Sequence, residues 1–126
     1  MDVRHVFVYG TLRRGDDNDI TQLTPSPQFV SEASIQGSMF HLGAYPGVVL
    51  GGTGTVRGEV YSVSAVLQKK LDEIEDVYPQ QRDEYFKRII AVQTALGELR
   101  CICYEINPAY IAGRRLIASG DWVKDR

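Results

Sequence analysis

Residues 3–12 read Val-Arg-His-Val-Phe-Val-Tyr-Gly-Thr-Leu, and the interpretation of the chain starts from this stretch. β-Branched and aromatic residues dominate residues 3–9, which predicts a strand that ends at Gly10. Because glycine permits unusual backbone angles, the break after the strand can turn successive N–H groups toward one point. Such a nest would bind a carboxylate or a developing oxyanion, and the plainer alternative is an ordinary turn. The candidate binding loop consists of Tyr9, Gly10, Thr11 and Leu12.

The remaining pattern predicts one α+β domain over residues 1–126. Residues 13–27 are rich in Asp, Arg, Gly and Pro and are interpreted as a loop with a short helical turn. Further strands are predicted at residues 29–40, 48–50, 56–63, 88–94 and 99–106. Turns are predicted at Tyr45-Pro46-Gly47, at residues 51–54 and at residues 95–98, with a short helical turn after Pro108. The fold class is therefore a mixed, mainly antiparallel β-barrel of about six or seven strands with a few short helices.

The clearest helix is predicted over residues 64–76, with Ser64 as its N-cap and Pro79 beyond its end. At ~100° per residue, Leu71 falls about 40° from Leu67 and Glu75 about 80°, so Glu75 lies at the edge of the apolar stripe. The other acids of this helix, Asp72, Glu73 and Asp76, are expected to point toward solvent.

Glu75 is therefore the candidate catalytic residue. Burial at the edge of an apolar face would raise its pKa and suit it to proton transfer near neutral pH. The alternative is a structural glutamate that turns outward or pairs with Arg82, Lys87 or Arg88.

Composition narrows the possible partners. The net charge of −2 gives no reason to expect nucleic acid or an anionic membrane as a partner. Cys101 and Cys103 would lie on one face of a strand, roughly 6.5–7 Å apart, which disfavours a disulfide. Two thiols without a histidine cluster make a poor zinc site, and the glycines have the wrong spacing for a dinucleotide motif. We expect no metal and no cofactor. Since no signal peptide or ~20-residue apolar run is present, we expect a cytoplasmic protein.

Several segments, in order along the chain, resemble the γ-glutamylcyclotransferase-like superfamily, and in particular its small bacterial members. The matching segments are Val6-Phe7-Val8-Tyr9-Gly10-Thr11-Leu12, Tyr45-Pro46-Gly47, Val56-Arg57-Gly58-Glu59-Val60-Tyr61, Leu71-Asp72-Glu73-Ile74-Glu75 and Gly120-Asp121-Trp122. The resemblance implies a mixed β-barrel, release of 5-oxoproline from γ-glutamyl compounds, Glu75 as the acid/base, and residues 9–12 as the substrate-binding loop. Two positions differ from the family pattern: Asp76 replaces the usual glycine, and Tyr85-Phe86-Lys87-Arg88 replaces Y-x-R.

The reaction expected from the resemblance is intramolecular. The α-amine of the substrate would attack its own γ-carbonyl, close a five-membered lactam and expel an amine. Glu75 would accept the proton from the α-amine and pass it to the departing nitrogen. Two alternatives are a non-catalytic binding module for a small acidic metabolite or peptide end, and a different amide-bond transferase or hydrolase that uses the same glutamate. The oligomeric state and the leaving amine do not follow from the sequence.

Overall fold

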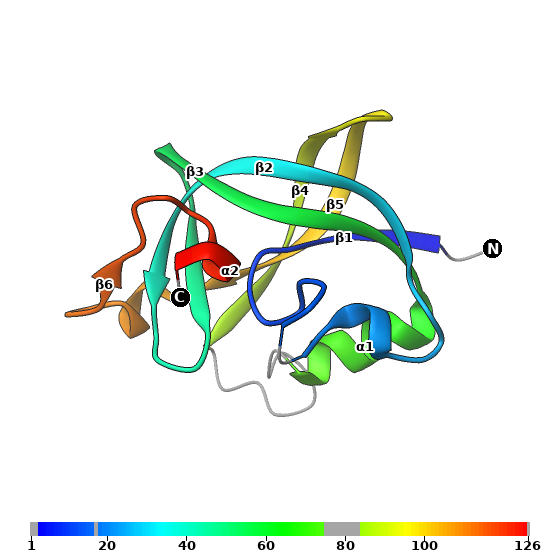
Figure 1. The fold of residues 1–126 in the computed structure, drawn as a ribbon, viewed down its shortest axis with the longest axis horizontal. Helices are drawn as coiled ribbons and strands as arrows, with labels where there is room; N and C mark the ends of the chain where they lie inside the picture. The colour runs from blue at the N-terminus through cyan, green and yellow to red at the C-terminus, as the bar shows by residue number, and fades with distance from the viewer. Residues whose placement is uncertain (1–2, 17, 75–83, 126) are drawn as a thin grey trace.

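The computed structural model describes residues 3–16, 18–74 and 84–125, and it is shown as a ribbon in Figure 1. Its strands are β1 (Val3–Val8), β2 (Gln28–His41), β3 (Pro46–Ser64), β4 (Tyr85–Thr94), β5 (Gly97–Ile106) and β6 (Arg115–Leu116). Its helices are α1 (Ala65–Ile74) and α2 (Trp122–Asp125), with 3₁₀ turns η1 (Ile20–Gln22) and η2 (Pro108–Tyr110).

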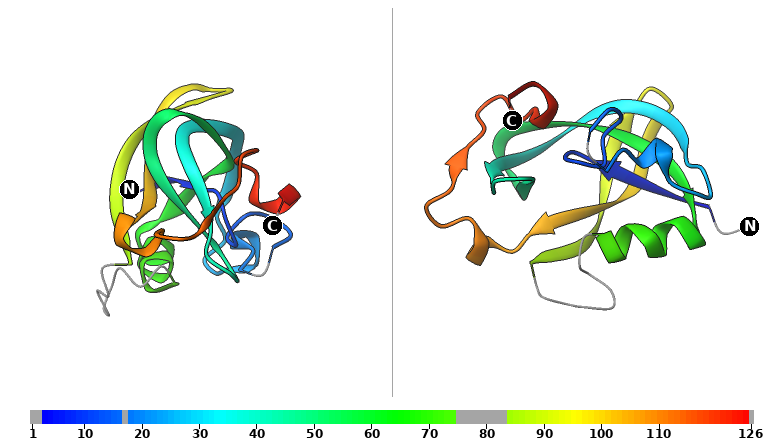
Figure 2. Two further views of the ribbon diagram at one scale, coloured as in Figure 1. Left: turned by 90° about the vertical axis from the view of Figure 1, so that its left-hand side faces the viewer. Right: turned by 60° about the horizontal axis from the view of Figure 1, so that its bottom comes forward.

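The six strands form one sheet in the order β4-β5-β1-β3-β2-β6. Only the β1–β5 pair is parallel among these described strands, and the other neighbours are antiparallel. The sheet curls into a half-barrel, which the two views of Figure 2 make plain. This confirms the predicted fold class of a mixed, mainly antiparallel sheet with a few short helices.

The second half of the central strand β1, residues 6–8, is buried on both faces, which explains why these residues are all apolar, whereas Arg4 near its start is exposed. Val6 and Val8 belong to a core cluster that also contains Leu67 of α1. Phe7 belongs to a second cluster that contains Trp122 from the C-terminal end of the chain. The strand therefore carries the candidate binding loop out from between two packed layers.

The structure corrects the prediction of two separate strands at residues 48–50 and 56–63, because β3 runs without interruption from Pro46 to Ser64. The predicted turn is nevertheless present as an irregularity in the pairing. Gln36 of β2 pairs with Thr55 whereas its neighbour Gly37 pairs with Leu50, so residues 51–54 form an excursion out of the ladder. Two glycines with positive φ allow this excursion, and the backbone on either side stays extended.

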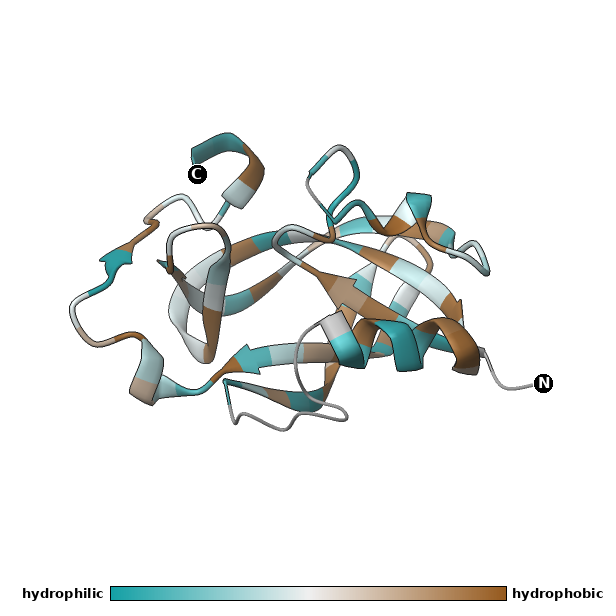
Figure 3. Ribbon diagram, turned by 90° about the horizontal axis from the view of Figure 1, so that it is seen from below, coloured by the Kyte–Doolittle hydropathy of each residue, from teal (hydrophilic) through white to brown (hydrophobic). Residues whose placement is uncertain are grey.

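Helix α1 begins as predicted, since the Ser64 hydroxyl accepts a hydrogen bond from the N–H of Leu67 at 3.1 Å. Leu67 and Leu71 are fully buried, and hydrophobic and hydrophilic residues alternate along α1 in Figure 3. The expectation for Asp72 was wrong: it is 9% exposed, because β4 and β5 present polar partners to that side of the helix. Glu73 is exposed, as predicted.

The C-terminal segment returns to the sheet instead of extending away from it. The N–H of Ile117 donates to the carbonyl of Met39 on β2 at 2.8 Å, and Trp122 at the start of α2 is 3% exposed. The Trp122 ring lies against His41, with ring centroids 5.0 Å apart. These contacts pack the C-terminal segment against β2. Neither described helix is long and apolar enough to cross a membrane.

Candidate active site

A cavity of about 240 Å³ opens where β1 ends. Its walls come from the loop after β1, from the β2–β3 turn, and from β4 and β5. The residues that line it are Phe7, Val8, Tyr9, Gly10, Thr11, Leu12, Asn18, Ala44, Tyr45, Pro46, Glu84, Tyr85 and Tyr104. The four residues of the predicted binding loop therefore all contribute to a single pocket.

The backbone carbonyl groups of this loop accept hydrogen bonds from amides of the same loop region. The carbonyls of Gly10, Thr11 and Leu12 accept hydrogen bonds from later amides at 2.9–3.0 Å. In the part of the chain that the structure describes, the N–H groups of the same three residues have no backbone acceptor. N–H donors that lack such an acceptor and lie beside a cavity suit a carboxylate or an oxyanion.

Gly10 also brings the β2–β3 turn against the loop. A Cβ placed on Gly10 would lie 2.8 Å from the ring carbons of Pro46, which is too close for any other residue without a shift. Likewise, a Cβ on Gly47 would lie 2.7 Å from Ile106. The glycines of both sequence patterns are therefore needed for close packing, and together they fix one rim of the pocket.

Tyrosine side chains bind the pocket walls to one another. The Tyr9 hydroxyl donates to the backbone carbonyl of Tyr104 at 2.5 Å, which joins β1 to β5. The Tyr85 hydroxyl donates to the carbonyl of Pro46 at 2.8 Å. The Tyr45 hydroxyl donates to the Glu84 carboxylate at 2.5 Å, near the mouth. These bonds hold the aromatic walls in place before any ligand arrives.

Behind the Tyr104 wall lies the buried acid of α1. Asp72 accepts a hydrogen bond from the Tyr104 hydroxyl at 2.6 Å and pairs with the Lys87 ammonium at 2.9 Å. Lys87 was one of the cations suggested as a partner for Glu75, and Arg88, another, pairs with Glu105 at 3.0 Å. Asp72 therefore ties the end of α1 to the strand that carries Tyr104.

The predicted catalytic residue, Glu75, and the neighbouring Asp76 and Arg82 lie outside the described residues. Helix α1 is described as far as Ile74. The assignment of Glu75 therefore stays a prediction. Among residues 3–16, 18–74 and 84–125, no group of three His, Cys, Asp or Glu side chains is placed to hold a metal ion. Cys101 and Cys103 are both buried and form no disulfide.

Sequence reasoning missed several pocket residues. Asn18 came from a segment treated only as a loop, and Glu84 precedes the predicted start of β4. Tyr104 was counted as an ordinary strand residue. No local pattern marks these three, because each reaches the pocket only through strand pairing or loop folding. Tyr45 belonged to the turn pattern that was singled out, so one signal for it existed.

Comparisons with known proteins agree with this geometry. A family model described as "Gamma-glutamyl cyclotransferase, AIG2-like" matches residues 6–124. The chain is 34% identical over 119 residues to the gamma-glutamylcyclotransferase family protein YtfP of Escherichia coli K12, covering 94% of this chain and 95% of YtfP. It is 38% identical over 87 residues to the gamma-L-glutamyl-butirosin B gamma-glutamyl cyclotransferase of Niallia circulans, covering 68% of this chain and 54% of that protein.

A solved structure has a similar fold. The crystal structure of YkqA from Bacillus subtilis superposes with a TM-score of 0.75 at 29% identity, covering 97% of this chain. The chain spans 40% of the length of YkqA. The match extends over the sheet, the pocket loop and the C-terminal segment alike.

Proposed function

The chain belongs to the AIG2-like gamma-glutamyl cyclotransferase family, and from this premise we propose that it cyclises a small γ-glutamyl compound to 5-oxoproline and releases an amine. The observation that carries the proposal is the pocket at the end of β1. There the N–H groups of Gly10, Thr11 and Leu12 lack backbone acceptors among the described residues and border a cavity of about 240 Å³. A γ-glutamyl group offers both an α-carboxylate and a γ-carbonyl oxygen that such donors would bind.

The proposed reaction needs neither a nucleophile of the protein nor a metal. The nitrogen of the substrate's α-amine forms a bond to the γ-carbonyl carbon, and the amide bond to the leaving nitrogen breaks once the tetrahedral intermediate collapses. Holding the flexible γ-glutamyl chain in the attacking shape is worth up to about 7–11 kcal/mol in well-oriented cases. The aromatic walls, fixed by the hydroxyls of Tyr9 and Tyr85, supply this constraint.

Proton transfer is assigned to Glu75 in this proposal. An α-ammonium with a pKa near ~7.7–8 is not nucleophilic until it loses a proton, so a base is required. Glu75 would accept that proton and return it to the departing amine. The resemblance of Leu71-Asp72-Glu73-Ile74-Glu75 to the family's helix end, together with the edge of the apolar stripe predicted for Glu75 from the sequence, supports this assignment.

The leaving amine would occupy the mouth of the pocket, where the carboxylate of Glu84 accepts the hydrogen bond from Tyr45. The name of the Niallia circulans relative describes a γ-glutamyl group attached to butirosin B. We infer that γ-glutamyl-amines and γ-glutamyl-amino acids are the substrates to test first. The cytoplasmic location expected from the sequence is part of the same proposal.

The decisive experiment measures 5-oxoproline release from a panel of γ-glutamyl compounds by the wild type, Glu75→Gln and Glu84→Gln. We expect Glu75→Gln to lower turnover by ~10²–10⁴, the usual contribution of general acid–base catalysis. Glu84→Gln is the matched control, because it removes a carboxylate that lines the same pocket. It should retain turnover within about tenfold of the wild type, since it keeps a hydrogen bond to Tyr45.

Three outcomes would change the proposal. A large loss in Glu84→Gln with little change in Glu75→Gln would move the acid/base role to Glu84. An unchanged rate in both variants would contradict carboxylate catalysis altogether. A wild type that binds γ-glutamyl compounds and releases no 5-oxoproline would be a binding module with this fold.

A further inference from the structure

The proposed reaction leaves two of the sequence patterns without a role, namely the Gly58–Glu59 pair on β3 and the Gly120–Asp121 pair before α2. Both pairs meet at the same place in the structure, directly behind the pocket loop. Glu59 is only 5% exposed. A buried carboxylate is costly unless it is fully paired, so its partners show what it holds.

Both oxygens of Glu59 are occupied. One accepts a hydrogen bond from the backbone N–H of Arg14 at 3.0 Å and another from the Tyr61 hydroxyl at 2.7 Å. The other oxygen pairs with Nε of Arg13 at 3.2 Å. Burial, together with the bond to Glu59, raises the pKa of Tyr61, so this hydroxyl stays a donor. Glu59 therefore binds two consecutive residues of the loop, Arg13 and Arg14.

Arg13 also reaches the C-terminal segment. Its Nη1 pairs with Oδ1 of Asp121 at 2.9 Å, so one guanidinium joins an acid of β3 to an acid beside α2. Both side chains are largely buried, with 11% of Arg13 and 18% of Asp121 exposed. A planar guanidinium suits two carboxylates at once, whereas an ammonium acts as a point charge.

The C-terminal segment is itself anchored independently of Arg13. The carbonyl of Gly120 accepts the N–H of Arg57 on β3 at 2.8 Å. A Cβ on Gly120 would lie 1.7 Å from the carbonyl oxygen of Thr55, so only glycine fits there. Asp121 is therefore presented to the loop from a fixed position.

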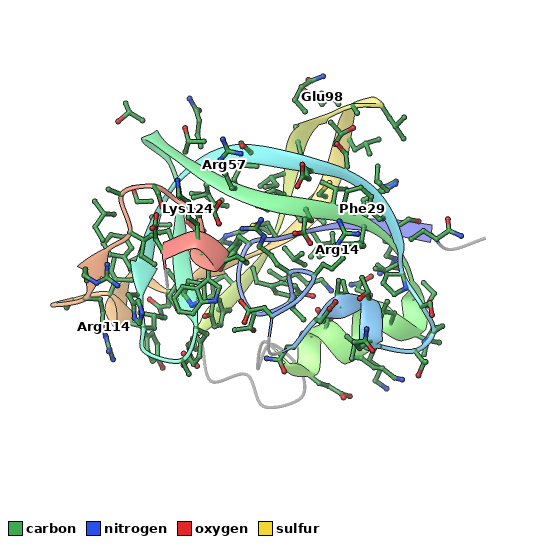
Figure 4. The ribbon with its side chains drawn as sticks, viewed as in Figure 1. Arg14, Phe29, Arg57, Glu98, Arg114 and Lys124 are labelled. Carbon is green, nitrogen blue, oxygen red and sulfur yellow. The ribbon has the colours of Figure 1, made fainter. Side chains whose placement is uncertain are left out.

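Arg13 and Arg14, the two residues that Glu59 binds, directly follow the pocket-lining segment. The N–H of Arg13 donates to the carbonyl of Gly10 at 3.0 Å, which closes the turn. The side chain of Arg14 lies over the Phe29 ring at 5.1 Å, and Figure 4 shows the two labelled side chains together on the face of the sheet. Holding residues 13 and 14 therefore holds the turn whose residues line the cavity.

We propose that Glu59 and Asp121 are positioning residues which, through Arg13, hold the loop of residues 10–12 in its ligand-binding form. The C-terminal segment thus belongs to the binding site although it does not line the pocket. This inference rests on the proposed function for the identity of the ligand, and on the described contacts alone for the order of the loop.

The test uses Asp121→Asn and Arg13→Lys, with Arg88→Gln as the matched control. Arg88 makes an exposed ion pair to Glu105 on the β4–β5 hairpin and does not line the pocket. Amide hydrogen exchange reports the loop directly, because the N–H groups of Asn18 and Ile20 donate to the carbonyls of Thr11 and Leu12. 5-Oxoproline, the product of the proposed reaction, serves as the binding probe.

In Asp121→Asn and Arg13→Lys we expect exchange at Asn18 and Ile20 to rise about tenfold, the size expected for loss of one charge-assisted hydrogen bond. Exchange in β4 and β5 should stay unchanged. The affinity for 5-oxoproline should fall by a similar factor, and in turnover the loss should appear mainly in KM. Arg88→Gln should leave all of these quantities as in the wild type.

Uniformly faster exchange across the whole sheet would overturn the inference, because the network would then act on global stability alone. Unchanged exchange at Asn18 and Ile20 would overturn it as well. A wild type without affinity for 5-oxoproline would count against the proposed function. The exchange of the two loop amides would still decide whether the network orders the loop.

Discussion

Two buried acids, Glu59 and Asp72, hold different segments around the pocket, and their hydrogen-bond partners differ. Glu59, 5% exposed, is held by the Arg13 guanidinium, a backbone N–H and the Tyr61 hydroxyl. Asp72, 9% exposed, is held by the Tyr104 hydroxyl and by Lys87, whose side chain is 30% exposed. Glu59 therefore joins the pocket loop to β3, and Asp72 joins α1 to β4 and β5.

This difference indicates how rigidly each acid holds its part of the pocket. Every partner of Glu59 is fixed, since each is a backbone group or a largely buried side chain. Lys87 has a flexible stem and access to water, so it can leave Asp72 at little cost. We therefore expect the loop wall to be the more rigidly determined one and the α1 wall to tolerate more change.

The largest expected effect is on the free energy of unfolding. Glu59→Ala leaves a largely buried guanidinium with one acid fewer and a buried hydroxyl without its acceptor, which should cost about 3–5 kcal/mol. Asp72→Ala should cost about 1–3 kcal/mol, because Lys87 can turn to solvent. Urea unfolding of the two variants measures the difference. Equal losses, or a greater loss in Asp72→Ala, would contradict the comparison.

A matched pair of tyrosine variants tests the comparison between Glu59 and Asp72 more finely. Tyr61→Phe removes a hydroxyl from Glu59 and Tyr104→Phe removes one from Asp72, with the same change in shape. Each should cost about 1–1.5 kcal/mol, and Tyr104→Phe should cost the more because Asp72 keeps only Lys87 among its described partners. Thermal melts give both values. Of the two, Tyr104→Phe alone should alter ligand affinity, since Tyr104 lines the pocket and Tyr61 does not.

A smaller expected effect is the pH-dependent contribution of Asp121 to the free energy of unfolding. Burial alone would raise the pKa of Asp121, but the Lys124 N–H and the Arg13 guanidinium outweigh it and hold the pKa below the ordinary 3.8. Asp121 therefore stabilises the fold above that pH, and the contribution disappears as the pH falls through its folded value.

The wild type should accordingly exceed Asp121→Asn in stability by up to about 1 kcal/mol at neutral pH. The gap should begin to narrow near the ordinary pKa of 3.8 and close as the pH falls through the lower folded value of Asp121. Denaturant melts of both proteins from neutral to acidic pH measure it. A gap that widens on acidification would show that Asp121 acts through something other than its charge.

The smallest expected effect is a lack of thiol reactivity on β5, the strand that carries Tyr104. Cys101 is fully buried, and burial raises its pKa to about 11. At pH 7 a thiol reagent should therefore label it only when the strand opens, since the thiolate is the reactive form. Labelling followed by mass spectrometry measures the rate. Fast labelling in the wild type would show that β5 opens locally on the face that belongs to the core cluster of Phe7 and Trp122.

Much of the fold follows from local sequence chemistry. The β-branched run before Gly10 determined a strand, and Ser64 with Leu67 and Leu71 determined where α1 begins and which face it buries. The hairpin of β4 and β5 followed from its glycine-containing turn. These predictions held because propensity, capping and turn preferences act over a few neighbouring residues.

The exceptions show where local reasoning stops. Helical periodicity placed Asp72 toward solvent, yet β4 and β5 supply Lys87 and Tyr104 to that side of the helix. The turn predicted at residues 51–54 did not end the strand, because β2 resumes pairing on either side of it. In both cases a neighbour distant in sequence decided the outcome.

The sequence by itself determined the family, the strand that carries the pocket loop and the membership of residues 9–12 in the candidate site. Only the tertiary structure brought Glu84 and Tyr104 into the same cavity. It also placed Glu59 and Asp121 on the two sides of one arginine. The physical reason is that a charged side chain is buried only where its partners are supplied, and here the partners come from segments 46 and 108 residues away along the chain.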